Sequence, residues 1–159
     1  MRKKFLSASP ADTTALGRFL GMRLERGDCL ALFGELGSGK TTLIKGVVDS
    51  ALSGAPVEVT SPTFCLVNVY TATARPAVYH IDLYRIKGVS ELSGIGWDEY
   101  VTSREGASII EWADKAVDFL PEDYLKIELE HLEKDFRLIT ISALTKKYRR
   151  FVVFPGHQA

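Results

Sequence analysis

Residues 34–41 read Gly34-Glu35-Leu36-Gly37-Ser38-Gly39-Lys40-Thr41, which is the G-x-x-x-x-G-K-S/T pattern of a phosphate-binding loop. The apolar run Cys29–Phe33 precedes the pattern and predicts a strand over residues 28–33. Apolar residues at helical spacing follow it and predict a helix over residues 40–52: Leu43, Ile44, Val47, Val48 and Ala51. Because the pattern is informative only between a strand and a helix, we favour a nucleotide-binding loop over a glycine-rich turn without a ligand.

The residue types of this segment suit a bound polyphosphate. Three of them are glycines: Gly34, Gly37 and Gly39. Glycine allows backbone conformations in which successive N–H groups point at an anion, and the dipole of the following helix adds to their field. Lys40 is placed to hold negative charge on the outer phosphates, and Thr41 offers a hydroxyl to Mg²⁺. Thr42, in the first helical turn, is expected to face the phosphates as well.

The composition is that of an ordinary folded protein. The chain has 159 residues, 46% hydrophobic and 25% charged, and one domain of this length buries roughly 70% of its unfolded surface. Its 20 basic and 20 acidic side chains cancel, so no strong overall field attracts it to nucleic acid or membranes. The apolar start is too short for a secretory signal, and no segment is long enough for a membrane span. The length and composition predict a single domain over residues 1–159. The two cysteines lack metal-ligand spacing and are typical of reduced thiols, so we expect the protein in the cytoplasm.

The remaining patterns predict an α/β fold around the loop. Ser9 is expected to cap a helix whose apolar stripe continues up to Gly27. Residues 64–71 and 77–83 are typical of two strands, and their short link makes them antiparallel neighbours. Helical patterns over residues 88–101 precede three further strands, at 107–111, 124–130 and 136–142. We therefore expect a P-loop NTPase fold: a mixed, mostly parallel sheet with an inserted antiparallel strand pair and helices on both faces.

Two acidic residues stand where apolar strands end. Asp82 follows the run 78–81, and Glu111 follows the run 107–110. The carboxyl ends of parallel strands are where such sheets bind ligands, and a carboxylate there holds Mg²⁺ or orients water. Both are therefore candidates for catalysis and metal binding, against the alternative of two exposed strand termini. The hydroxyl-rich segment 61–64 is either a loop that senses an outer phosphate or a polar turn that caps its own backbone.

Several motifs occur in the order found in one protein family. They are Thr13 with Gly17, the loop 34–42, Ser61-Pro62-Thr63-Phe64, His80-Ile81-Asp82-Leu83-Tyr84-Arg85, Gly96-Trp97-Asp98-Glu99-Tyr100 and Ile110-Glu111-Trp112. On these motifs, which cover residues 9–130, the chain resembles the bacterial TsaE (YjeE) ATPases of tRNA threonylcarbamoyladenosine biosynthesis.

The resemblance implies a role for each matching residue. Thr41, Glu111 and Asp82 would lie at the magnesium ion, with Asp82 also orienting or deprotonating water. Together with Lys40, the two carboxylates would form the catalytic set. Trp112 would flank the catalytic edge, and segment 61–64 would be the switch loop. The implied contacts to ATP or ADP are Thr13, Gly34, Glu35, Leu36, Gly37, Ser38, Gly39, Lys40, Thr41, Thr42 and Trp112.

The resemblance also implies a function that depends on partners. The chain would hydrolyse ATP, weakly alone and faster with partners, so that the enzyme forming threonylcarbamoyladenosine in ANN-decoding tRNAs can turn over repeatedly. Those partners are the threonylcarbamoyl transferase subunit and its inactive paralogue, with tRNA reached only through the complex and no membrane involved. Two alternatives remain: a small-molecule kinase that uses the same loop, and a module that binds nucleotide without hydrolysis.

Two further features have no assigned role. His80 lies mid-strand without other histidines or cysteines at ligand spacing, so a structural role is favoured over metal binding. The basic run Lys146-Lys147-Tyr148-Arg149-Arg150 lies outside the matching motifs. It is either a solvated surface, which we favour, or a local contact to tRNA phosphates.

Overall fold

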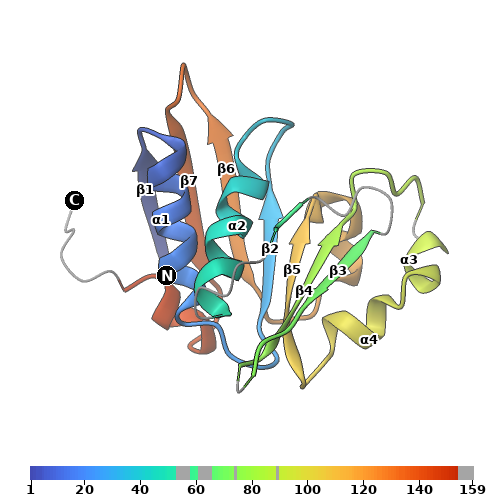
Figure 1. Cartoon of the computed structure of the whole chain (residues 1–159). Helices are drawn as coiled ribbons and strands as arrows, with labels where there is room; N and C mark the ends of the chain where they lie inside the picture. The colour runs from blue at the N-terminus through green and yellow to red at the C-terminus, as the bar shows by residue number, and fades with distance from the viewer. Residues whose placement is uncertain (53–57, 61–65, 74, 89, 154–159) are drawn as a thin grey trace.

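The four central strands of the sheet run parallel, in the order β6, β2, β5 and β4 (Figure 1). Strands β7 and β1 extend the sheet antiparallel on one side, and β3 pairs antiparallel with β4 on the other. The computed structural model describes residues 1–52, 58–60, 66–73, 75–88 and 90–153. The strands are β1 Arg2–Ser7, β2 Cys29–Phe33, β3 Val67–Tyr70, β4 Ala77–Asp82, β5 Gly106–Glu111, β6 Leu125–His131 and β7 Arg137–Ala143. The mixed sheet and the antiparallel pair are thus confirmed.

Helices cover both faces of the sheet, as expected. On one face lie α1 (Pro10–Gly21) and α2 (Lys40–Ala51), side by side (Figure 1). On the other lie α3 (Ser90–Gly94), α4 (Trp97–Val101) and the 3-10 helix η1 (Ala113–Phe119). The two buried clusters of apolar side chains, one on each face, hold the layers together by burial of nonpolar surface. Within the described residues, no helix is long and apolar enough to cross a bilayer.

Helices α1 and α2 approach each other closely because small residues face each other. A Cβ on Gly17 would lie 2.2 Å from the carbonyl oxygen of Leu43, and one on Gly46 would lie 2.2 Å from that of Thr14. Such distances leave no room for a side chain. The contact brings the first turn of α1 against the start of α2, where the phosphate-binding pattern ends.

Helix α1 begins as predicted and ends earlier. The Ser9 hydroxyl caps it by accepting a hydrogen bond from the Asp12 N–H at 3.2 Å. The helix stops at Gly21 rather than continuing to Gly27, and the chain turns back toward the sheet. Leu24 is buried although it lies in the turn after the helix. Because it is apolar and at helical spacing, the sequence pattern placed the end of the helix too late.

Strand β1 was not predicted. Its first five residues are exposed or half-buried, so the sequence has no alternating pattern there. The strand forms because it pairs along its whole length with β7, from Arg2 opposite Ser142 to Ser7 opposite Arg137.

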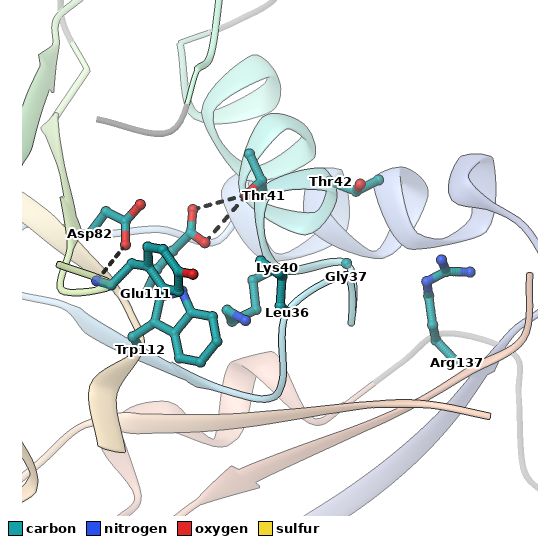
Figure 2. Close-up of a pocket in the computed structure, with 11 residues that line it drawn as sticks. Leu36, Gly37, Lys40, Thr41, Thr42, Asp82, Glu111, Trp112 and Arg137 are labelled. Atoms are coloured by element: carbon teal, nitrogen blue, oxygen red, sulfur yellow. Dashed lines mark hydrogen bonds between the residues drawn. The ribbon is translucent and has the colours of Figure 1, made fainter. Parts of the chain in front are cut away.

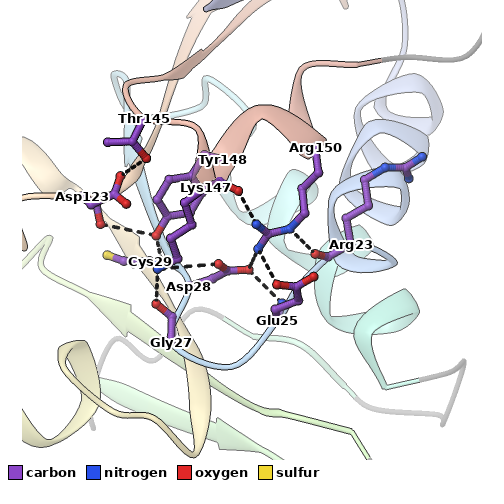
Figure 3. Close-up of polar contacts among 10 residues, drawn as sticks. All are labelled: Arg23, Glu25, Gly27, Asp28, Cys29, Asp123, Thr145, Lys147, Tyr148 and Arg150. Atoms are coloured by element: carbon purple, nitrogen blue, oxygen red, sulfur yellow. Dashed lines mark hydrogen bonds and ion pairs between the residues drawn. The ribbon is translucent and has the colours of Figure 1, made fainter.

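The basic run near the C-terminus is only partly a solvated surface. Residues 147–151 form the 3-10 helix η2 (Lys147–Phe151), in which Tyr148 and Phe151 are buried. Lys147 Nζ donates to the Gly27 carbonyl at 2.7 Å, and Arg150 pairs with the buried Asp28 (Figure 3). The favoured interpretation is therefore wrong for Tyr148, which is buried, and for Arg150, which pairs with Asp28. It holds for Lys146, Lys147 and Arg149, which are exposed, although Lys147 also bonds to the Gly27 carbonyl.

Candidate nucleotide-binding site

A cavity of about 350 Å³ opens at the carboxyl ends of the parallel strands (Figure 2). Strands β2, β4 and β5 end there, and the first turn of α2 forms one wall. It is lined by Leu36, Gly37, Gly39, Lys40, Thr41, Thr42, Asp82, Tyr84, Glu111, Trp112 and Arg137. The topology of the sheet thus brings the loop and both predicted carboxylates to one place.

The loop needs glycine at two positions in particular. Gly34 has φ 148°, and a Cβ on it would lie 2.4 Å from the Leu129 carbonyl oxygen. Gly39 has φ 102° and directly precedes α2, where a residue with a side chain would be strained. The loop can therefore lie tightly against β6 and turn directly into α2.

Lys40 is held inside this site by carbonyl groups of its own loop. Its Nζ donates to the carbonyls of Gly34 at 2.6 Å and Glu35 at 3.0 Å, and lies 3.9 Å from the centre of the Trp112 ring. Burial lowers the pKa of the Lys40 ammonium, while nearby carboxylates, first Glu111, oppose that shift. A cation that is buried against carbonyl dipoles and an aromatic face is suited to an anionic ligand.

The side chain of Thr41 faces the Glu111 carboxylate. The Thr41 hydroxyl lies 3.3 Å from both Oε1 and Oε2 of Glu111 (Figure 2). Asp82 stands opposite Glu111 in the register of β4 and β5, and neighbouring strands are about 4.8 Å apart. Its Oδ1 accepts a hydrogen bond from the Tyr84 N–H at 2.9 Å. A hydroxyl and two carboxylates beside a phosphate-binding loop are the hard oxygen donors that Mg²⁺ prefers, so the residues present fit that ion.

Glu111 has a second partner that the sequence did not reveal. His80 Nε2 lies 2.8 Å from Glu111 Oε1, and both side chains are buried. His80 is not in the cavity lining but stands behind it. Among the described residues, the hydrogen-bond partner of the His80 ring is thus a candidate catalytic residue, which gives its predicted structural role a link to the site.

Trp112 has an unusual backbone conformation at the mouth of the cavity. It is in the left-handed region, with φ 58° and ψ 43°, where the chain leaves β5 and enters η1. Its ring packs 5.1 Å from that of Tyr84, centre to centre. Residues with side chains rarely adopt this conformation, and those that do cluster at functional sites. The geometry turns the ring over Lys40 instead of continuing the strand.

Arg137 is a cavity residue that the sequence analysis missed. It begins β7 and lies on the far side of the loop from Trp112 (Figure 2). A Cβ on Gly39 would lie 3.3 Å from the Arg137 Cδ and Nε atoms, so the guanidinium stem borders the loop. Its position depends on how β7 meets the sheet, and no local pattern indicates it.

Some predicted contacts lie outside the cavity lining. Gly34, Glu35 and Ser38 belong to the loop but do not line the cavity, and the Ser38 hydroxyl is buried with no hydrogen-bond partner among the described residues. Thr13 is fully buried, and its hydroxyl bonds to that of Ser7 at 2.8 Å. A direct contact from Thr13 to a base or ribose remains a prediction. The predicted switch segment 61–64 and Cys65 lie outside the described residues.

Comparison with known proteins identifies the family of this chain independently of its structure. Residues 7–139 match the family model described as threonylcarbamoyl adenosine biosynthesis protein TsaE. The chain belongs to the TsaE family. A Bacillus subtilis relative named tRNA threonylcarbamoyladenosine biosynthesis protein TsaE is 34% identical, covering 91% of this chain and 88% of the relative. A Treponema pallidum relative of the same name is 36% identical, over 86% and 98% of the two chains.

A solved structure agrees with the fold. The crystal structure of YdiB from Bacillus subtilis superposes with a TM-score of 0.78 at 28% sequence identity, covering 96% of this chain and 92% of that one. Membership of the TsaE family and the P-loop fold thus confirm what the motifs indicated. The matched region contains every residue of the cavity.

Proposed function

We propose that the protein is a Mg²⁺-dependent ATPase that supports formation of threonylcarbamoyladenosine in tRNA. One observation supports this above all: the Thr41 hydroxyl and the Glu111 carboxylate meet at 3.3 Å beside the buried Lys40. Binding a nucleotide needs the loop alone, whereas a metal-oriented hydrolysis also needs carboxylates at this edge. The names of the relatives support the tRNA pathway over a small-molecule kinase.

In this proposal each side chain has a distinct task. Lys40 exchanges its bonds to the loop carbonyls for bonds to the outer phosphates, where charge develops during transfer. Thr41 and Glu111 would hold Mg²⁺, which when bound would neutralise phosphate charge. Asp82 orients the attacking water and accepts its proton. We assign the base to Asp82 because the Glu111 carboxylate faces the Thr41 hydroxyl and would be occupied by the metal ion.

The partners follow from the family and are part of the proposal. We infer that the chain acts in the cytoplasm with the threonylcarbamoyl transferase subunit and its inactive paralogue, and reaches tRNA only through them. The test is ATP hydrolysis by the purified chain alone, with both proteins, and with both proteins and tRNA. Strong stimulation by the assembled proteins is expected. Phosphoryl transfer to a small metabolite faster than to water would instead favour the kinase.

A further inference from the structure

We propose that His80 is a positioning residue that holds the Glu111 carboxylate in the orientation facing Thr41. This inference rests on the proposed function, since it assigns His80 a task in that same site. His80 is on β4 and Glu111 is on the neighbouring strand β5. The 2.8 Å contact between His80 Nε2 and Glu111 Oε1 is the basis of the assignment.

The contact is buried on both sides. The exposed fraction of the His80 side chain is 0%, and that of Glu111 is 4%. A carboxylate only accepts hydrogen bonds, so the ring donates its Nε2–H to Oε1. The other ring nitrogen, Nδ1, has no partner within the described part of the chain. Nε2 thus makes the ring's one polar contact there, and that contact is with Glu111.

The bond restricts the rotation of the carboxylate. The terminal torsion of a glutamate is broad, so an unrestrained carboxylate samples many orientations. Oε1 of Glu111 receives the His80 N–H on one side and lies 3.3 Å from the Thr41 hydroxyl on the other. Only a narrow range of torsions satisfies both contacts. Hydrogen bonds to metal-binding carboxylates act in this way, and losing one costs about 10–100-fold in metal affinity or activity.

The antiparallel edge strand keeps the His80 ring in place. Tyr70 on β3 stacks on the ring at 6.4 Å between centres, with an angle of 24° between the planes. Asn68, which stands opposite His80 in the strand register, donates to the Tyr70 hydroxyl at 3.2 Å and to the Thr60 carbonyl at 3.1 Å. The inserted strand pair thus has a function in the site: it orients His80, and His80 orients Glu111.

The test compares two variants of similar length. His80→Gln keeps an N–H donor near the position of Nε2, whereas His80→Met fills similar space without a donor. Calorimetry with ADP is done on each folded variant, once in EDTA and once across a range of Mg²⁺ concentrations. In EDTA the wild type and both variants should bind ADP with the same affinity. The Mg²⁺ concentration that gives half of the full change in ADP binding should be about 10–100-fold higher in the Met variant than in the wild type. In the Gln variant it should return toward the wild-type value.

Two results would overturn the inference. One is an unchanged Mg²⁺ requirement in a folded Met variant. The other is equal impairment of the Gln and Met variants, which indicates that ring packing, not the N–H, matters. Where the Met variant is too unstable, the same substitution is made in a Glu111→Ala background. There it should no longer change the Mg²⁺ requirement, and an additive effect contradicts the inference. Absence of ADP binding by the wild-type protein would instead contradict the proposed function.

Discussion

Thr41 and Glu111 come from distant parts of the chain, yet the Thr41 hydroxyl lies 3.3 Å from both carboxylate oxygens of Glu111. Thr41 is at the start of α2, and Glu111 is the last residue of β5. The parallel pairing of β2 with β5 brings them together, because α2 begins where β2 ends. The short distance between Thr41 and Glu111 therefore results from the order of the strands in the sheet. A metal ion held by both side chains would lie between them.

Replacing Glu111 should affect the metal more than the nucleotide. We expect Glu111→Ala to lower Mg²⁺-dependent ATP hydrolysis about 100-fold or more, because the loop keeps its phosphate contacts while the metal loses a ligand. ADP affinity measured in EDTA should change little. Glu128→Ala is the matched control, since Glu128 pairs with Lys126 on β6 outside the cavity. Equal losses of hydrolysis and of EDTA binding would point to a folding defect.

Asp82 should matter for turnover rather than for binding. General-base catalysis contributes about 10²–10⁴-fold, so we expect Asp82→Ala to lower kcat by that factor with ADP affinity retained. Single-turnover hydrolysis and calorimetry on the same preparation measure the two effects. Normal turnover in the variant would remove Asp82 from the mechanism.

The buried ion pair beneath β2 should make stability depend on pH. Burial raises the pKa of Asp28, while Arg150 and the Glu25 N–H partly offset that shift. A carboxyl with a raised folded pKa costs stability in full above that pKa; the cost shrinks as pH falls below the folded pKa and vanishes below the unfolded pKa. Arg150→Met removes the main partner and raises the folded pKa further. We expect a loss of about 3 kcal/mol at pH 8 and a smaller loss at pH 5.

Urea unfolding at the two pH values measures this difference. The double variant Arg150→Met with Asp28→Asn serves as the control, because without a carboxyl the extra pH dependence should vanish. ADP binding should be the same in all three proteins, since the cluster lies at the start of β2 and the loop follows its end. A loss of stability relative to the wild type that is the same at both pH values contradicts the assignment.

The close contact between α1 and α2 should tolerate no side chain. A Cβ on Gly46 would lie 2.2 Å from the Thr14 carbonyl oxygen, so Gly46→Ala should destabilise the protein by about 1–3 kcal/mol. Gly94→Ala is the control, because a Cβ there would meet no atom of the described residues within 4 Å. Thermal unfolding of both variants tests the contact, and equal midpoints would mean that the helices can separate without cost.

The sequence predicted those parts of the site that depend on local pattern. The loop between a strand and a helix and the strand-end carboxylates were visible because strand, turn and helix preferences agree there. Arg137 and the His80–Glu111 contact were not, because each depends on which strands become neighbours. The end of α1 was misplaced since burial of Leu24 does not distinguish a helix from a packed turn. The basic run was misjudged because Asp28, the partner of Arg150, is far away in sequence.

The central claim is that Lys40 and its loop bind and cleave a Mg²⁺-bound triphosphate. Its most direct test is ATP hydrolysis by the wild-type protein and by Lys40→Ala at equal thermal stability, with ADP calorimetry on both. We predict measurable hydrolysis and single-site ADP binding by the wild type, with hydrolysis abolished in the variant. Equal hydrolysis by the two proteins, or no heat from ADP with folded wild-type protein, would contradict the account.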